Sequence, residues 1–165
     1  MTWHKINLES KKLLELSKKN SLTISTAESC TGGLIASAII HNPGSSHIFN
    51  KGYITYSNQS KINDLSVKEE VLDNFGSVSK ECCIMMLNGL LKKSKANIGI
   101  AVTGIAGPDG SSEEKPLGTV WISFGNLKNL ISEKIIFKGS RLDVRLQTTL
   151  FSLKQLNKFI SQNYS

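Results

Sequence analysis

A polar turn between a strand-like run and an apolar helix holds the strongest candidate for a nucleophile. The turn lies in the segment Thr26–Gly33, which reads Thr-Ala-Glu-Ser-Cys-Thr-Gly-Gly. A helix that begins near Thr31 would direct free backbone N–H groups toward any group held above the turn. Those N–H groups can bind a phosphate, or they can stabilise an oxyanion if Ser29 attacks a carbonyl carbon. The turn alone favours a helix-capping role for Ser29, with nucleophilic attack as the alternative.

A serine nucleophile needs a base, and three side chains are candidates. His41 and His47 lie on either side of a Pro-Gly turn without an acid nearby in the sequence. Lys61 follows a strand-like run and could reach the same sheet edge as the serine. A lysine acts as a base only if burial or a neighbouring charge lowers its pKa from about 10.4 toward neutrality. Tyr56 could relay or orient a proton, although a strand tyrosine more often packs. The residues alone leave the base open.

The chain has three cysteines, and none of them predicts a metal or a disulfide. Their number is odd, and Cys82 and Cys83 are neighbours that cannot form an ordinary bridge. No Cys-x-x-Cys or His-x-x-x-His spacing indicates a zinc site. Cys30 competes with Ser29 as the nucleophile, but its apolar neighbours favour a buried structural cysteine. We therefore expect no bound metal and a reducing compartment.

Two arginines stand out because the other basic residues are all lysines. Arg141 and Arg145 are four residues apart and therefore share one face of a helix. A forked guanidinium binds phosphate or carboxylate in a way that lysine does not reproduce. Surface ion pairs, with Asp143 nearby in sequence, are an equally good interpretation.

The elements that must position these side chains follow from the apolar pattern. Strand-like and helical runs alternate over the first two thirds of the chain, and a predicted hairpin follows. This order predicts an α/β fold with a mixed sheet in one domain spanning residues 1–165. Four polar or glycine-rich segments follow apolar runs, and we expect them to gather where ligands bind open sheets, beyond the carboxyl ends of the strands. Helices are predicted at residues 5–19, 34–40, 67–75, 79–93 and 141–160, strands at 22–26, 51–56, 98–103, 119–124 and 131–137, and the four segments at 28–33, 43–46, 56–61 and 103–108.

Composition and charge narrow the class of protein. The chain has 165 residues, 39% of them hydrophobic and 20% charged, which is typical of a globular domain. The net charge of +7 comes from 18 lysines and 2 arginines against 13 acidic residues. The lysines are spread along the chain, so a solvated surface is favoured over a nucleic-acid site. No apolar run of about 18 residues indicates a membrane span. The beginning of the chain lacks the apolar stretch of a secretory signal, so we expect a cytoplasmic protein with no membrane partner.

Six motifs, in their order along the chain, resemble the CinA C-terminal domain family. They are Thr-Ala-Glu-Ser-Cys-Thr-Gly-Gly at 26–33, Pro-Gly-Ser-Ser at 43–46, Thr-Tyr-Ser-Asn…Lys at 55–61, Val-Thr-Gly-Ile-Ala-Gly-Pro at 102–108, Lys-Pro-Leu-Gly-Thr-Val at 115–120 and Gly-Ser-Arg…Arg at 139–145. Stand-alone members of this family are nicotinamide-nucleotide amidases, which convert nicotinamide mononucleotide and water to nicotinate mononucleotide and ammonia in pyridine nucleotide salvage. The resemblance implies a three-layer α/β/α sandwich with a mixed sheet, a homo-oligomer and no cofactor. The metal-dependent pyrophosphatase domain of larger members has no counterpart among these motifs, so its activity is not expected.

The resemblance also implies roles for individual residues. Ser29 becomes the expected nucleophile, Lys61 its base and Tyr56 an assisting group. The loop at 109–114 is poorer in glycine than is usual in the family, which predicts altered flexibility without loss of activity. The residues implied in substrate binding are Glu28, Cys30, Thr31, Gly32, Gly33, Ser45, Thr103, Gly104, Ala106, Gly107, Arg141 and Arg145.

Two other functions are compatible with the sequence. A non-catalytic nucleotide-binding or regulatory module is suggested by the link between some members of the family and competence or DNA damage. A nucleic-acid-binding protein is suggested by the net charge of +7. The latter ranks last because no basic stripe with interleaved aromatic residues accompanies the charge.

Overall fold

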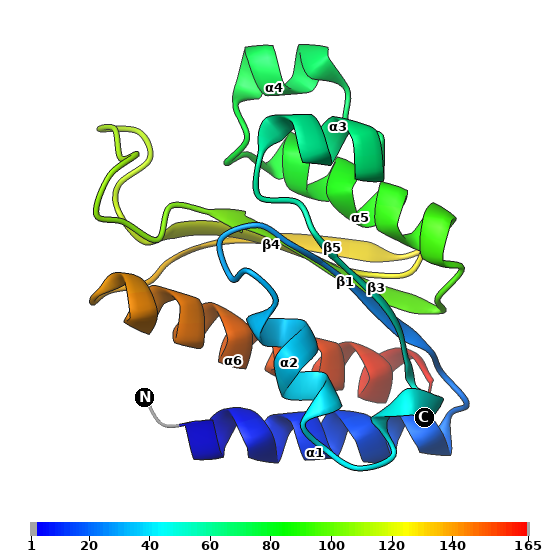
Figure 1. Ribbon diagram of the computed structural model, residues 1–165. Helices are drawn as coiled ribbons and strands as arrows, with labels where there is room; N and C mark the ends of the chain where they lie inside the picture. Colours follow the sequence, from blue (N-terminus) through cyan, green and yellow to red (C-terminus); the bar gives the residue numbers. More distant parts are fainter. Residues whose placement is uncertain (1–2, 165) are drawn as a thin grey trace.

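A mixed five-stranded sheet lies between two layers of helices in the computed structural model, which describes residues 3–164 (Figure 1). The strand order is β2-β1-β3-β4-β5. The first three strands in the chain are parallel, and β4 and β5 are antiparallel to their neighbours. The predicted three-layer α/β/α sandwich with a mixed sheet is thus confirmed. The strands are β1 (Ile24–Glu28), β2 (Phe49–Ile54), β3 (Ile98–Gly104), β4 (Thr119–Gly125) and β5 (Leu130–Ile136).

The helices divide between the two faces of the sheet and enclose two apolar cores. On one face α2 and α6 lie against the sheet and α1 packs on these two helices, and on the other face α5 lies against the sheet and α3 and α4 pack on it (Figure 1). The central strand β3 contributes to both cores, with Ile100 toward one and Ala101 toward the other, because successive side chains of a strand point to opposite faces. The helices are α1 (Trp3–Lys19), α2 (Leu34–Ile40), α3 (Asn58–Leu65), α4 (Glu69–Phe75), α5 (Lys80–Ser94) and α6 (Arg141–Asn163).

Capping residues set the ends of the helices nearest the candidate site. Ser79 accepts a hydrogen bond from the Cys82 N–H and begins α5, as predicted. Ser140 and Asp143 form a reciprocal capping box at the start of α6. Gly76, with a φ of 78°, ends α4. These caps fix where the chain enters and leaves the edge of the sheet that carries the candidate site.

Two predicted elements differ from the structure in ways that affect the site. The first strand runs to Glu28, so that residue lies within the sheet and not in the turn. Residues 58–65 form α3, where the sequence suggested a loop. This helix is short and mostly polar, and therefore gives little periodic signal. Its N-cap is Ser57, whose hydroxyl accepts from the Ser60 N–H.

Candidate active site

The carboxyl ends of β1 and β3 meet at one edge of the sheet around a small polar cavity. The cavity measures about 140 Å³. Its position matches the rule that ligands bind beyond the carboxyl ends of strands in open sheets. The turn after β1, the start of α3, the turn between α4 and α5, the loop after β3 and the start of α6 contribute to its wall. The lining residues are Ser29, Cys30, Tyr56, Lys61, Ser77, Val78, Thr103, Gly104, Ala106 and Arg141.

Ser29 and Lys61 are in direct contact within this cavity. The Lys61 Nζ lies 3.2 Å from the Ser29 Oγ. The same nitrogen donates to the carbonyl oxygens of Thr55, at 2.9 Å, and Tyr56, at 3.3 Å. A neutral lysine amine has two N–H groups and one lone pair. The two carbonyls can therefore take both N–H groups and leave the lone pair for the serine O–H, which is the arrangement of a base with its nucleophile.

The surroundings of Lys61 favour this neutral form. Its side chain is 1% exposed and is among the largest fully buried side chains in the described part of the protein. Burial lowers its pKa below the ordinary value of 10.5, because taking an ammonium group out of water is costly. The described residues provide no carboxylate within salt-bridge distance of this amine. The structure therefore supplies a condition that the sequence could not test, which is burial that lowers the pKa of this lysine.

The position of Lys61 depends on close packing between α3 and α5. Leu65 ends α3 and is fully buried, and its carbonyl group lies against Gly89 of α5. A Cβ atom at residue 89 would overlap the Leu65 carbonyl oxygen, so only glycine allows the two helices to approach this closely. This contact brings α3, and Lys61 with it, down onto the sheet edge.

The other candidates for nucleophile and base are not arranged for catalysis. Burial raises the pKa of the Cys30 thiol to about 12, which makes it a poor nucleophile. His41, at the end of α2, packs edge-on against Trp3. His47 lies in the short 3₁₀ helix that precedes β2. Both histidines are at the opposite edge of the sheet from Ser29, and Lys61 is the candidate base beside the serine.

Glu28 organises the turn that carries Ser29. Its carboxylate is fully buried, and Oε2 accepts hydrogen bonds from the Thr31 hydroxyl and from the N–H groups of Gly33 and Ile35. Oε1 accepts from the Ala36 N–H. We expected the N–H groups at the start of α2 to face a ligand, but they donate to the Glu28 carboxylate instead. Glu28, predicted to bind substrate, therefore acts as the internal anion at the start of α2.

Only the first amides of the turn are left for a ligand. The Ser29 N–H donates to the Val102 carbonyl, and the Gly32 N–H donates back to the Ser29 carbonyl. Over residues 3–164, the amides of Cys30 and Thr31 donate to no carbonyl or carboxylate. An N–H group directly after a nucleophile is a common component of an oxyanion hole. The donors predicted at residues 30–33 are thereby narrowed to residues 30 and 31, and of these two residues Cys30 lines the cavity. Ser29 does not cap α2, because Gly33 occupies the capping position.

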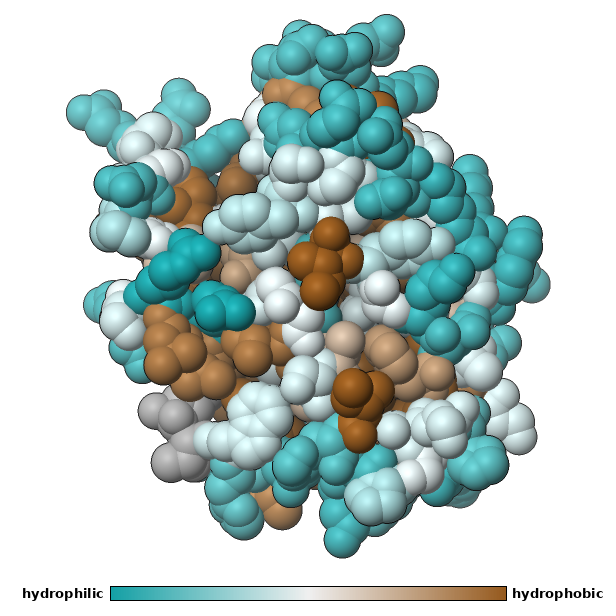
Figure 2. Space-filling view, in the orientation of Figure 1, coloured by the Kyte–Doolittle hydropathy of each residue, from teal (hydrophilic) through white to brown (hydrophobic). Residues whose placement is uncertain are grey.

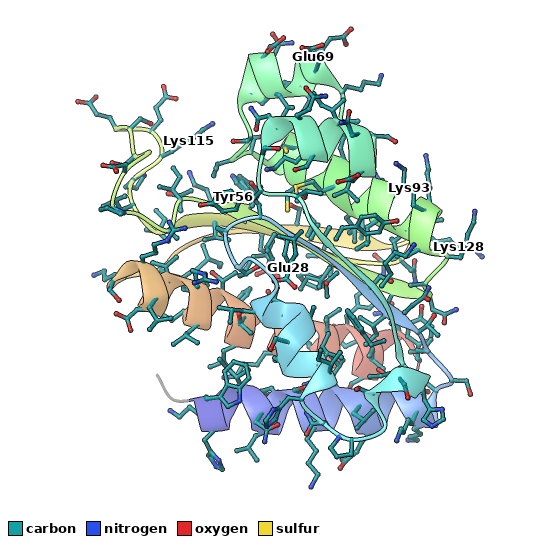
Figure 3. The ribbon with its side chains drawn as sticks, viewed as in Figure 1. Glu28, Tyr56, Glu69, Lys93, Lys115 and Lys128 are labelled. Carbon is teal, nitrogen blue, oxygen red and sulfur yellow. The ribbon has the colours of Figure 1, made fainter. Side chains whose placement is uncertain are left out.

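The two arginines have different positions although they share one helical face. Arg141 lines the cavity, donating from Nη1 to the Gly107 carbonyl and from Nη2 to the Tyr56 hydroxyl. Arg145 does not line it, and its Nη2 instead donates to the Thr31 carbonyl at 2.9 Å. The tyrosine hydroxyl is therefore engaged with Arg141. Figure 3 shows Tyr56 at the sheet edge and Glu28 between the sheet and α2.

The structure adds two residues that the sequence analysis missed. Ser77 and Val78, in the turn between α4 and α5, form part of the cavity wall. The Thr103 hydroxyl donates to the Ser77 carbonyl and joins this turn to the end of β3. Residues 76–79 were interpreted only as the end of one helix and the start of the next. The combination of Gly76 with the two serines was the signal that could have found them.

Ser45 is the predicted binding residue that the structure separates most clearly from the others. It lies in the 3₁₀ helix before β2, and its hydroxyl donates to the Ile40 carbonyl at 3.5 Å. This region is next to the amino ends of the strands, because the Ile24 N–H donates to the Ile48 carbonyl. A parallel strand places its two ends at opposite edges of the sheet. The segment 43–46 therefore closes α2 and does not join the cavity.

Neither a metal cluster nor a membrane helix occurs in the part of the chain that the structure describes. Among residues 3–164, no group of three or more His, Cys, Asp or Glu side chains could hold a metal ion. Within the same range, no helix is long and apolar enough to cross a membrane. All three cysteines are free and buried.

Comparison with known proteins identifies the family. Residues 7–160 match the sequence model of the CinA C-terminal domain. The chain belongs to the CinA C-terminal domain family. Its similarity to the nicotinamide-nucleotide amidohydrolase PncC of Escherichia coli K12 is 43% identity over 147 residues, covering 88% of this chain and 89% of that protein. A putative competence-damage inducible protein of Clostridioides difficile is 47% identical over 138 residues, or 84% of this chain.

The fold of this CinA domain is also that of its solved relatives. The crystal structure of the competence/damage inducible protein CihA from Agrobacterium tumefaciens superimposes with a TM-score of 0.92 at 38% sequence identity. The match covers 94% of this chain and 95% of that one. A CinA superfamily protein of Klebsiella pneumoniae gives a TM-score of 0.92 at 29% identity. The chain spans about a third of the length of some curated relatives, including 33% of the Clostridioides difficile protein.

Proposed function

We propose that this protein is a nicotinamide-nucleotide amidase that hydrolyses nicotinamide mononucleotide to nicotinate mononucleotide and ammonia. The observation that carries the proposal is the buried contact between Lys61 Nζ and Ser29 Oγ in a polar cavity. The 43% identity to the Escherichia coli amidohydrolase supports the same reaction, since it extends over nearly the whole of both chains. The nicotinamide group, a pyridine ring with a carboxamide, is small and planar, and the cavity of about 140 Å³ suits such a group.

In the first half of the reaction, Ser29 is acylated. Neutral Lys61 takes the proton from the Ser29 O–H as the oxygen attacks the carboxamide carbon. The carbonyl electrons move to the oxygen, which the N–H groups of Cys30 and Thr31 stabilise. The carbon–nitrogen bond then breaks, and the amide nitrogen takes the proton from Lys61 and leaves as ammonia. Pyridine nucleotide and Ser29 are joined as an ester.

In the second half, water replaces ammonia. The lysine amine, neutral again, accepts a proton from water as the water oxygen attacks the ester carbon. Collapse of the second oxyanion breaks the bond to Ser29, whose oxygen recovers the proton from Lys61. The carboxylic acid that forms loses the second proton of the water to solvent, and nicotinate mononucleotide leaves as the carboxylate. Each proton taken by the lysine is returned, so the site ends the cycle in its starting state.

The ribose phosphate of the substrate is assigned to the side of the cavity formed by Arg141. This arginine is exposed and belongs to the cavity wall, and its guanidinium has N–H groups beyond those donated to Gly107 and Tyr56. The backbone after β3, at Gly104 and Ala106, is the neighbouring wall. Arg145, the alternative phosphate ligand, is engaged with Thr31 below the turn.

A panel of pyridine compounds tests the proposal. Ammonia release is measured for nicotinamide mononucleotide, nicotinamide riboside and nicotinamide with the unchanged protein and with Ser29→Ala. We expect the fastest ammonia release from nicotinamide mononucleotide and slower release from nicotinamide riboside and nicotinamide, which lack the phosphate. With Ser29→Ala we expect no ammonia release above background. Full activity of Ser29→Ala would overturn the covalent scheme. Tight binding of the mononucleotide without ammonia release would instead favour the non-catalytic nucleotide-binding module.

The proposal includes a homo-oligomer in the cytoplasm. Strand β2 is an edge of the sheet with an exposed face, and Ile54 at its end is 59% exposed. Ile40 at the end of α2 is also exposed. On the face of the molecule seen in Figure 2, apolar side chains form small groups separated by polar surface. Light scattering of the purified protein measures the assembly. A monomer at all concentrations would contradict this part of the proposal.

A further inference from the structure

The turn that carries Ser29 is held from two sides by oppositely charged side chains. Below it, Glu28 accepts the Thr31 hydroxyl at 2.7 Å. From α6, Arg145 donates to the Thr31 carbonyl at 2.9 Å. Thr31 itself is fully buried and its contact with Arg145 is half-buried, so competition from water is limited. The peptide units on both sides of Thr31 are therefore fixed before any substrate arrives.

This arrangement matters because of what lies on the other face of the turn. The N–H groups of Cys30 and Thr31 have no acceptor among residues 3–164, and Cys30, which directly follows Ser29, lines the cavity. An oxyanion hole works only if its donors already point at the place where negative charge develops. Hydrogen bonding of the hydroxyl and the carbonyl of Thr31 to charged partners limits rotation of the backbone that carries these donors.

We propose that Arg145 is a positioning residue that holds the oxyanion hole of this amidase, and that it does not bind the substrate phosphate. Three observations support this role. Arg145 is absent from the lining of the cavity, whereas Arg141 is part of it. Its guanidinium reaches the turn so closely that a Cβ on Gly32 would lie 3.4 Å from its Nη2. Its Nε is buried and has no hydrogen-bond partner in the described structure. Burying an unpaired N–H group costs free energy, so other contacts of Arg145 must hold the guanidinium in this position.

The charge of Arg145 also acts on the turn. Burial raises the pKa of Cys30 to about 12, and the positive charge of Arg145 opposes that rise. A cation felt at residue 30 is also felt by an oxyanion held by the amides of residues 30 and 31. Arg145 thus combines a geometric role with a favourable electrostatic one.

The experiment rests on the proposed amidase activity and separates the two roles of an arginine. Arg145→Ala is assayed with nicotinamide mononucleotide and with nicotinamide riboside. A residue that fixes the oxyanion hole lowers kcat for both substrates by about 10²-fold and changes KM little. A phosphate ligand raises KM for the mononucleotide alone. A raised KM for the mononucleotide alone would overturn the proposal. Arg141→Ala is the matched comparison, because that variant is expected to show this rise in KM.

Rescue distinguishes positioning from a general loss of structure. Methylguanidinium added to Arg145→Ala is expected to restore part of kcat, because it can donate to the Thr31 carbonyl in the vacated space. If Arg145→Ala does not fold, Arg145→Lys carries the test, since it keeps the charge but loses the fork. Wild-type kcat in Arg145→Ala, or in Arg145→Lys where the alanine variant does not fold, would overturn the proposal.

A second readout keeps the proposal independent of the substrate. A fluorophosphonate labels an activated serine and needs donors for its phosphoryl oxygen. We expect labelling of Ser29 in the unchanged protein and labelling at least about tenfold slower in Arg145→Ala. If the unchanged protein labels but releases no ammonia, the proposed function fails and the positioning role is still decided by the labelling rates. Equal rates in the two proteins, or no labelling of either, would refute the positioning role.

Discussion

Lys61 Nζ and Ser29 Oγ lie 3.2 Å apart although 32 residues separate them in the chain. Two parallel strands and a short helix create this contact. Ser29 directly follows strand β1 at the carboxyl ends of the parallel strands, and Lys61 lies in α3, which packs next to that position. Both side chains of this contact are buried. A base with a lowered pKa is useful only beside its nucleophile, and the fold satisfies both conditions at one point.

Removing the nucleophile should abolish the reaction, while removing the neighbouring thiol should not. Ser29→Ala is expected to lower kcat by roughly 10⁴-fold or more, because covalent catalysis is lost. Cys30→Ala is the matched control and should retain activity, since burial raises the pKa of its thiol to about 12. Steady-state ammonia release measures both. A loss confined to Cys30→Ala would move the nucleophile by one residue.

The pH dependence of the reaction should report Lys61. The base must be neutral, so kcat/KM should fall as pH drops through the Lys61 pKa, which burial places below 10.5. Lys61→Arg should be inactive at every pH, because a guanidinium does not deprotonate. A pH–rate profile of the unchanged protein with a flat acidic limb down to pH 5 would contradict Lys61 as the base.

The same lowered pKa predicts a pH dependence of stability. Between the folded-state pKa of Lys61 and its ordinary value of 10.5, the unfolded chain holds a proton that the folded protein has lost. The free energy of unfolding should therefore gain a contribution that increases as pH rises through this window. Lys61→Met removes this contribution and should itself fold, since an apolar side chain suits the buried site. Urea denaturation of both proteins at several pH values measures the difference.

Arg141 should act on the binding of the phosphate. Arg141→Gln is expected to raise KM for nicotinamide mononucleotide by about 10- to 100-fold, the value of a charged hydrogen bond of about 1.5–3 kcal/mol. Nicotinamide riboside, which lacks the phosphate, should be affected much less. Tyr56→Phe removes the hydroxyl bonded to Arg141 and should give a smaller increase in the same direction. An unchanged KM ratio between the two substrates in Arg141→Gln would rule out this role.

Gly89→Ala should destabilise the protein, in contrast to the usual effect of this substitution inside a helix. Alanine normally favours a helix over glycine by about 1 kcal/mol. At residue 89, however, the new Cβ would overlap the Leu65 carbonyl and push α3 away from α5. Thermal unfolding should show a lower Tm, and activity should fall because Lys61 moves with α3. Asn88→Ala, at the half-buried neighbouring position, is the control and should leave both nearly unchanged.

The sequence predicted most of the fold because apolar periodicity is strong in its long elements. The helix that begins after Ser79, the hairpin of β4 and β5, and the buried strand β3 all lie where the pattern places them. Helix α3 was missed because its residues are mostly polar, and it is stabilised by its cap and by contact with Gly89. Local sequence does not record such a contact.

For the site, the sequence by itself determined the residue types and the motifs that hold them. Ser29, Lys61 and Arg141 were candidates from the residues, the resemblance to the family implied the roles of Ser29 and Lys61, and the structure brings the three to one cavity. Only the tertiary structure decided the environment of each side chain. In the folded protein Lys61 is buried, and N–H groups at the start of α2 donate to the Glu28 carboxylate. Arg145 donates to the Thr31 carbonyl, and Ser45 lies at the other edge of the sheet. The physical reason is that basicity, hydrogen-bond partners and solvent exposure depend on groups distant in sequence, which become neighbours only when the sheet and its two helical layers assemble.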